Sequence, residues 1–276
     1  AVVGGVDGAG KPTLQNLTLQ GAGLAGLDNA GQTATLRATN LVLANPAGVG
    51  FAPGGTLGHG ALAIVADTLT LGSGYKTIAG YDTVSIDANV LHGEAQGTTS
   101  VDALLAMTLA RLEGGAGADQ TLRSTAVLSV ASCSADRVLA PVTTLGAQWI
   151  LAGTAVDFDS QASLPSGTLR LEATQGDVHL GAQARVDVAG RSVAFFDTAK
   201  PSWGGTAELA STTGNVVVDA GANVDVSAAA GGDAGLLVVT ASQGTVALAD
   251  GSVTGQAPAD ADGVRGEGAQ VAIDAG

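Results

Sequence analysis

The chain has 276 residues, of which 42 are glycine, and its formal net charge is −14. Only 3% of the residues are aromatic and 13% are charged, although 46% are hydrophobic, so the apolar side chains are mostly small or β-branched. This composition excludes disorder, which needs low hydrophobicity, and nucleic-acid binding, which needs clustered Lys and Arg. The single cysteine, Cys133, excludes a disulfide framework. No run of about 18 apolar residues is present, so we expect no membrane insertion of this segment.

Short alternating segments recur along the first half of the chain. ATLRATNLVL (34–43) matches LAIVADTLTL (62–71), and VSIDANVLHG (84–93) matches LAMTLARLEG (105–114). The alternation of apolar and polar residues is typical of strands with one buried face. The segment 101–115 also has the Ala and Leu content of a helix, but its match to 84–93 favours a strand.

The repeat is clearest in the second half. TLRLEATQGDVHLGAQARVDV (168–188) recurs without a gap as TAELASTTGNVVVDAGANVDV (206–226), and LLVVTASQGTVALADGS (236–252) repeats the pattern. Strands this short cannot enclose a core alone, whereas stacked copies bury a continuous apolar column. We therefore predict an all-β fold, a parallel β-helix (β-solenoid) of about ten coils with variable loops.

No linker or charge run interrupts the pattern, so we predict a single continuous β-helix segment over 1–276. The segment RSVAFFDTAKPSWGG (191–205) separates two matched copies, and we expect a protruding loop insertion there. Phe195, Phe196 and Trp203 are its candidate contact residues, because exposed aromatic rings stack on sugars or proteins. In the alternative interpretation, Phe195 and Phe196 fold back and cover the shaft.

Three aspartates are the candidate metal ligands. Asp157, Asp187 and Asp225 occur in the similar segments VDF, VDV and VDV, and we expect them at equivalent outward positions about 4.8 Å apart in successive coils. Carboxylate oxygens are the ligands that calcium prefers, so these residues are weak calcium candidates. The alternative is a solvated acidic stripe that keeps the protein soluble. No other cofactor is expected.

Candidate catalytic residues do not form a distinct group in the sequence. Arg170, Arg185 and Arg191 lie near Asp177 and Asp187, but nothing groups them more tightly than the repeat itself does. A general acid and a general base need different environments, and these positions look alike. The three histidines are expected at surface or turn positions. We therefore expect no enzymatic activity.

Three stretches resemble the filamentous haemagglutinin-type exoproteins of two-partner secretion systems: SLPSGTLRLEATQGDVHLGAQARVDVAG (163–190), the FFDTAKPSWGGT insertion, and VDVSAAAGGDAGLLVVTASQGTVALADGSVTG after it. The resemblance covers nearly the whole chain and lies in the style of the repeat and a few loops. It implies a right-handed β-helix that is an interior shaft segment of a large fibre, secreted to the cell surface of a Gram-negative bacterium. It also implies an outer-membrane secretion partner for the parent protein and a host or bacterial cell-surface receptor or glycan.

Two main classes of function stay open. The first is a structural shaft segment of an adhesin-like fibre, serving cell adhesion or carrying a toxin in contact-dependent inhibition. The second is a carbohydrate-binding or carbohydrate-cleaving parallel β-helix, which would have a groove with an asymmetric carboxylate cluster. A phage-fibre module is a third class, and it predicts an obligate trimer.

Overall fold

The computed structural model describes residues 1–133 and 139–276, with only the backbone of Phe195 described. Within these ranges every regular element is a β-strand, and the strands form three sheets. The fifteen strands of the first sheet are β1 (Val2–Val3), β2 (Asn16–Gln20), β4 (Thr33–Ala44), β5 (Ala61–Leu71), β7 (Thr83–Gly93), β9 (Leu104–Gly114), β11 (Leu128–Ser132), β13 (Val156–Asp159), β14 (Gln161–Ser163), β16 (Val178–Leu180), β17 (Arg185–Asp187), β21 (Val216–Val218), β22 (Asn223–Asp225), β24 (Val246–Leu248) and β25 (Val253–Thr254). The nine strands of the second sheet are β3 (Gly23–Ala25), β6 (Gly74–Ala79), β8 (Gln96–Val101), β10 (Asp119–Ser124), β12 (Gln148–Gly153), β15 (Thr168–Ala173), β20 (Thr206–Ser211), β23 (Leu236–Ala241) and β26 (Gln270–Ala275). The third sheet consists of β18 (Ser192–Phe195) and β19 (Thr198–Pro201).

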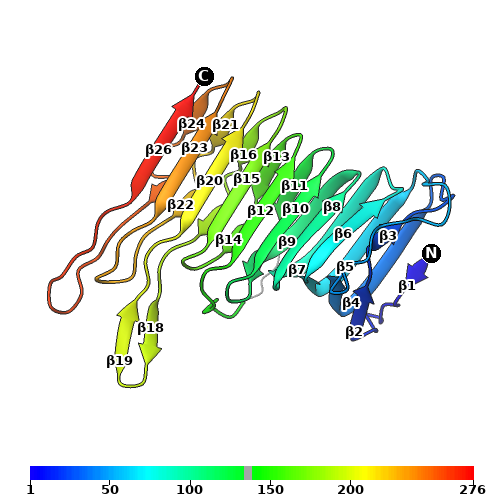
Figure 1. Ribbon diagram of the computed structural model, residues 1–276, viewed down its shortest axis with the longest axis horizontal. Coiled ribbons are helices and arrows are strands. Elements are labelled where there is room, and N and C mark those ends of the chain that lie inside the picture. Colours follow the sequence, from blue (N-terminus) through cyan, green and yellow to red (C-terminus); the bar gives the residue numbers. More distant parts are fainter. Residues whose placement is uncertain (134–138) are drawn as a thin grey trace.

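The chain passes back and forth between the two large sheets. From β5 to β10, each strand of one sheet is followed by a strand of the other, and each pairs in parallel with its counterpart in the neighbouring turn of the chain. In Figure 1 the strands of the nine-stranded sheet lie side by side from β26 to β3. This all-β arrangement of long parallel sheets is consistent with a β-solenoid or β-helix. Within the described ranges, the chain forms no helix with the length and apolar character that a membrane crossing requires.

The strand register follows the repeats in the sequence. Leu62 pairs with Ala34, and Val84 with Leu105. Thr168 pairs with Thr206, which pairs in turn with Leu236. The prediction of a strand in 101–115 is confirmed, because β9 pairs with β7 over its whole length. The repeat offsets are therefore the lengths of successive turns.

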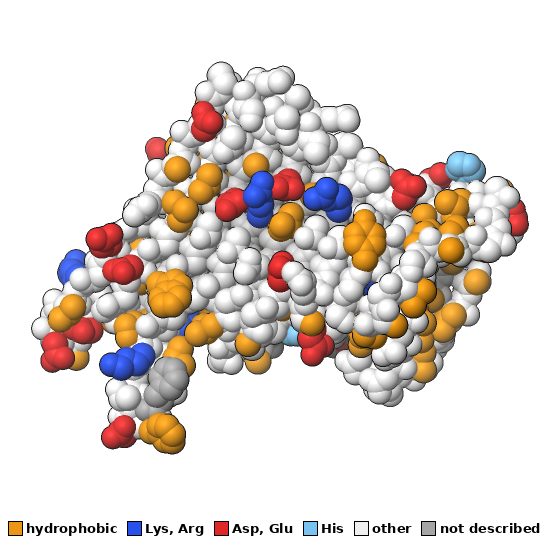
Figure 2. Space-filling model, viewed as in Figure 1, with side chains coloured by type: hydrophobic (Ala, Val, Ile, Leu, Met, Phe, Trp, Pro, Cys, Tyr) orange, Lys and Arg blue, Asp and Glu red, His pale blue; other side chains and the backbone are white. Residues whose placement is uncertain are grey.

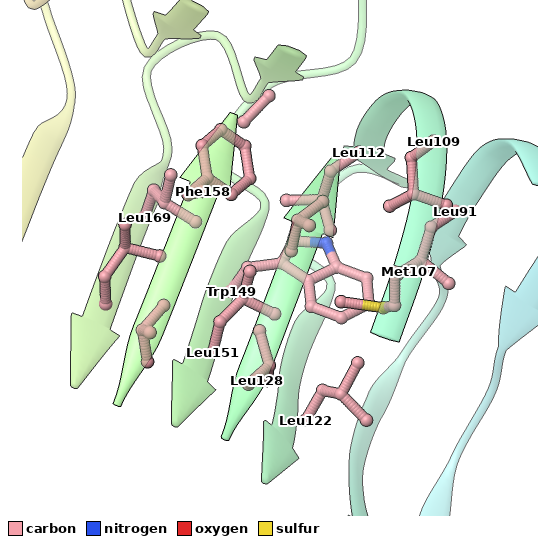
Figure 3. Packing of buried hydrophobic residues seen from close by; sticks show 14 of the residues in the cluster. Leu91, Met107, Leu109, Leu112, Leu122, Leu128, Trp149, Leu151, Phe158 and Leu169 are labelled. Atoms are coloured by element: carbon pink, nitrogen blue, oxygen red, sulfur yellow. The ribbon is translucent and has the colours of Figure 1, made fainter. Parts of the chain in front are cut away.

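Alternating side chains of both large sheets fill the space between them. Val84, Leu105 and Leu128 form one inward row, and all three are fully buried. The largest buried side chains are Trp149 and Phe158. Figure 3 shows the indole of Trp149 among the aliphatic side chains of this core. Its Nε1 donates to the carbonyl oxygen of Glu113 at 3.0 Å, so the ring is both buried and oriented.

Two turns of the chain lack a strand that their neighbours have. In the second sheet β3 pairs directly with β6, although β4 and β5 of the first sheet lie between them in the chain. The turn that contains β5 therefore has no strand of its own between β3 and β6. Likewise β14 pairs directly with the end of β9, because residues 139–147 run outside the first sheet after β11. These omissions interrupt the regular stacking and leave space beside it.

The segment 191–205 contains the antiparallel hairpin of β18 and β19, which projects from the body in Figure 1. Its turn is Phe196 and Asp197, and Phe196 has a φ of 53°. At the base of the hairpin, the Ser202 hydroxyl donates to the carbonyl of Arg191 at 3.0 Å. The Ser166 hydroxyl donates to Ser202 Oγ at 2.7 Å, which ties the hairpin to the stacked turns.

Glycines stack at corners where successive turns approach most closely. A Cβ added to Gly205 would lie 2.1 Å from the carbonyl oxygen of Gly167, and one added to Gly235 would lie 1.8 Å from that of Gly205. Gly214 and Gly244, which align in the sequence repeat, show the same crowding, because their added Cβ atoms would lie 2.3 Å from the carbonyl oxygen of Gly176 and 2.1 Å from that of Gly214. These positions need glycine because a neighbouring backbone occupies the space of a side chain.

We expect Gly205→Ala to lower the free energy of unfolding by about 2 kcal/mol, because overpacking against backbone costs about 1–3 kcal/mol. Gly268→Ala is the matched control, since nothing lies within 4 Å of its added Cβ. Its stability change should stay within about 0.5 kcal/mol. Urea unfolding followed by circular dichroism measures both variants. Equal stabilities would contradict the close approach of the turns.

Candidate binding groove

The prediction that Asp157, Asp187 and Asp225 stack in one row is wrong for Asp157. Asp187 and Asp225 are direct partners in β17 and β22, whereas Asp157 in β13 pairs with Ser129 and His179. The segment VDF is the counterpart of VHL (178–180) and belongs to an earlier part of the turn than VDV. The three carboxylates therefore do not form one ladder.

The two carboxylates that are neighbours already have partners. Asp187 forms an ion pair with Arg191, and Asp225 accepts a hydrogen bond from the backbone N–H of Ser227 at 2.9 Å. The guanidinium of Arg191 offsets the repulsion between the two aspartates. Among the described residues, no group of three His, Cys, Asp or Glu side chains is placed to hold a metal ion.

The strand omitted between β9 and β14 creates a groove of about 500 Å³ on the outside of the first sheet. Residues Leu139, Pro141 and Val142 of the displaced segment form one wall. The polar floor comes from β9, β14 and β17 and the residues around them, namely Arg111, Gln161, Ser163, Gln183, Arg185 and Asp187. We call this feature the arginine groove. Arg191, at the base of the hairpin, also lines the arginine groove. The same residue lines a second cavity of about 370 Å³ beside β18.

The structure brings together charged residues that the sequence did not group. Arg185, Arg191 and Asp187 share the groove with Arg111, which comes from a distant part of the chain. Asp177 lies elsewhere, where its carboxylate accepts the backbone N–H of Asn215 at 2.7 Å. The interpretation that nothing groups these residues is therefore wrong for Arg185, Asp187 and Arg191, whereas Arg170 and Asp177 lie outside the groove. The interpretation failed because the groove that groups these residues depends on the path of residues 139–147, and this segment carries no repeat.

Two of the three arginines in the groove are neutralised by carboxylates. Arg111 holds Glu113 through its Nε at 2.8 Å and its Nη2 at 2.5 Å, and Arg191 holds Asp187. His92 and Arg111 together keep the pKa of Glu113 below its ordinary value, the hydrogen bond from His92 being the larger influence. Arg185 has no carboxylate partner within the described part of the chain. Among the described residues, the groove thus holds one arginine without a carboxylate partner, in a chain of net charge −14.

His179 lies between two carboxylates on the outer face of the first sheet. Its Nδ1 is 3.0 Å from Asp157 Oδ1, and its Nε2 is 3.1 Å from Asp219 Oδ2. Partial burial by itself lowers the pKa of His179, but the hydrogen bond to Asp219 and the charges of both aspartates outweigh it. The pKa therefore lies above its ordinary value of 6.5. The prediction of an outward histidine holds, but its two partners come from distant parts of the sequence.

The predicted contact residues lie in and beside the hairpin. Phe196 is fully exposed in the turn, so it does not cover the shaft, and Trp203 is 68% exposed after β19. The side chain of Phe195 lies outside the described part of the structure. Figure 2 shows hydrophobic, basic and acidic side chains on the projecting hairpin, and a group of basic and acidic side chains near the middle of this face.

A buried lysine was also missed by the sequence analysis. Lys76 of β6 is 3% exposed, and its ammonium donates to the carbonyl oxygens of Gly72 at 2.7 Å and Gly74 at 2.8 Å. Burial lowers its pKa to about 8. It lines a largely apolar cavity of about 390 Å³ where β3 and β6 pair directly. The sequence contained one signal for the burial of Lys76. Lys76 lies two residues before Ile78, and residues two apart in a strand face the same side.

Comparison with protein-family models, with curated proteins and with solved structures finds no match for this chain. The resemblance to filamentous haemagglutinin-type exoproteins therefore rests on the quoted sequence segments and stays a prediction. The function has to be argued from the geometry and chemistry of the molecule.

We expect the melting temperature to depend less on pH in His179→Gln than in the unaltered protein. A raised pKa in the folded state means that His179 stabilises the fold fully below pH 6.5 and loses this effect as the pH rises through the folded-state pKa. Calorimetric scans from about pH 5.5 to about pH 8.5 span that window.

His59→Gln is the control for this measurement, because His59 is largely exposed beside the single carboxylate of Asp82. It should keep the pH dependence of the unaltered protein. If His179→Gln kept the same dependence, the two aspartates would not stabilise the protonated ring.

Proposed function

We propose that the chain is a right-handed parallel β-helix of about ten coils that serves as a shaft segment of a large secreted, adhesin-like fibre. In this proposal the fibre is displayed on the surface of a Gram-negative bacterium after export through an outer-membrane partner. Its role is mechanical, to hold a receptor-binding or toxin-bearing part of the parent protein away from the cell.

The observation that carries the proposal is the continuous parallel ladder. One path of directly paired strands runs from β1 through β4, β9 and β16 to β24, and a second runs from β3 to β26. Each step uses backbone hydrogen bonds between neighbouring turns, so the stack resists bending along its whole length. At about 4.8 Å per coil, ten coils give a rod of about 50 Å.

The outer surface also suits a soluble shaft. Asp177, Asn215 and Thr245 form a ladder of side chains on successive turns, in which Asn215 Oδ1 accepts from Thr245 Oγ1 at 2.9 Å. On the second sheet, Arg170 lies 2.6 Å from Glu172 and 3.2 Å from Glu208. The net charge of −14 favours solubility and opposes nonspecific self-association.

The arginine groove favours carbohydrate binding as a second candidate function. Its floor offers guanidinium, amide and hydroxyl groups, which suit a polar ligand. Carbohydrate cleavage has less support. Asp187 is the one carboxylate among the described residues that line the groove, and it pairs with Arg191. A two-carboxylate mechanism needs a second, protonated acid.

Deletion of one whole turn tests the shaft. Because Thr206 pairs with Leu236, deleting 206–235 joins equivalent positions and should preserve the register. We expect the shortened parent protein to be exported and to be labelled by antibody on intact cells. Deleting 206–220 removes only part of a turn and should abolish labelling. Labelling of the unaltered protein only after permeabilisation, or equal failure of both deletions, would contradict the proposal.

A further inference from the structure

Arg111 and Arg185 occupy corresponding positions on the floor of the arginine groove. Gln161 pairs with Arg185, and Ala162 pairs with Leu112, so Gln161 lies between the two arginines in one outward row. The row allows a comparison of the contacts of the two guanidinium groups, of which Arg111 is buried and Arg185 is exposed.

In Arg111 each part of the guanidinium has a partner. Nη1 donates to the backbone carbonyl oxygen of Ala140 at 2.9 Å. Nε and Nη2 form the edge that holds Glu113. This edge of a guanidinium matches the planar geometry of a carboxylate.

In Arg185 only the first half of this arrangement is present. Nη1 donates to the carbonyl oxygens of Ala184 at 2.8 Å and Gly221 at 2.6 Å, with Ala182 at 3.3 Å. These contacts fix the guanidinium at the start of β17. Within the described residues, Nε and Nη2 of Arg185 have no acceptor. The side chain is exposed, so solvent and ligands reach this edge.

The groups around Arg185 suit a ligand rich in hydroxyls. The side-chain amides of Gln161 and Gln183 have no hydrogen-bond partner among the described residues, and each offers both donors and an acceptor. The buried hydroxyl of Ser163 donates to Asp187 Oδ2 at 3.3 Å, so its oxygen is left as an acceptor for a ligand hydroxyl. The volume of about 500 Å³ lies in the range of small-molecule sites.

The groove does not suit an extended acidic peptide. Such a peptide binds by adding a strand to a free sheet edge, but β14 is paired on both sides, with β9 and β17. β17 is likewise paired on both sides, with β14 and β22. The backbone in the floor is therefore already used.

We propose that the arginine groove binds an acidic polysaccharide through a uronate unit. The carboxylate of the uronate lies on the Nε–Nη2 edge of Arg185, as Glu113 lies on that of Arg111. Hydroxyls of the sugar bond to Gln161, Gln183 and Ser163. This binding rests on the second candidate function, carbohydrate binding, and names its ligand class. It does not depend on the shaft function, since a shaft without a ligand would keep the same ladder.

Titration calorimetry with a tetragalacturonate, and with a neutral galactose tetramer as the matched probe, tests this inference. We expect the acidic tetramer to bind and the neutral one to bind at least about tenfold more weakly. Arg185→Gln should weaken binding of the acidic tetramer at least about tenfold. Arg185→Lys should also weaken it, because an ammonium lacks the planar edge. Arg123→Gln, which removes an exposed charge on the second sheet, should leave it unchanged.

Three results would overturn the inference: no binding of tetragalacturonate, equal binding by Arg185→Gln of unchanged melting temperature, or tighter binding of a sulfated tetramer than of the carboxylated one. If the Arg185 variants are unstable, Gln161→Ala tests the binding proposal instead. This variant should weaken binding, because it removes contacts with the sugar hydroxyls. Surface labelling of cells that carry Arg185→Gln should stay normal, which separates failure of this inference from failure of the shaft proposal.

Discussion

The structure depends on one constraint: the backbone groups of each turn must bond in register to the turns on either side. Short strands such as β16 and β21 have three residues each and no stability alone. They persist because β13, β16, β21 and β24 form a continuous ladder. A ladder of this kind requires close approach of successive turns, which explains the stacked glycines. It also explains the small side chains, since two sheets leave only a narrow core between them.

The same constraint determines where chemistry occurs. A turn that pairs fully with its neighbours has its outward side chains in rows on a flat surface. The side chains of those rows mostly hydrogen-bond to one another. Where a turn omits a strand, the ladder closes directly across it and the displaced chain lies outside. This happens between β9 and β14, beside the arginine groove, and between β3 and β6, beside the cavity at Lys76. The irregular turns therefore supply the cavities, and the regular turns supply rigidity.

The strands and their register were predictable because they depend on local alternation and on matching segments, whose offsets vary from turn to turn but give the pairing directly. Gly176, Gly214 and Gly244 align in the sequence for the same reason that they crowd in space. The position of Asp157 was not predictable from VDF alone, because similar triplets occur in two different parts of a turn. Only the distance from the preceding strand distinguishes them. The grouping of Arg111 with Arg185 depended on a displaced segment that has no periodic pattern.

The account is tested most directly by the distance between two outward positions in one row. Ser85 and Val217 are linked by five successive pairings, through Ala106, Ser129, Asp157 and His179. Spin labels at these two positions, in a chain with Cys133→Ser, report their separation by pulsed electron resonance. A parallel ladder predicts one narrow distribution near 24 Å, about five spacings of 4.8 Å. A broad distribution, or one centred far from this value, would contradict the ladder.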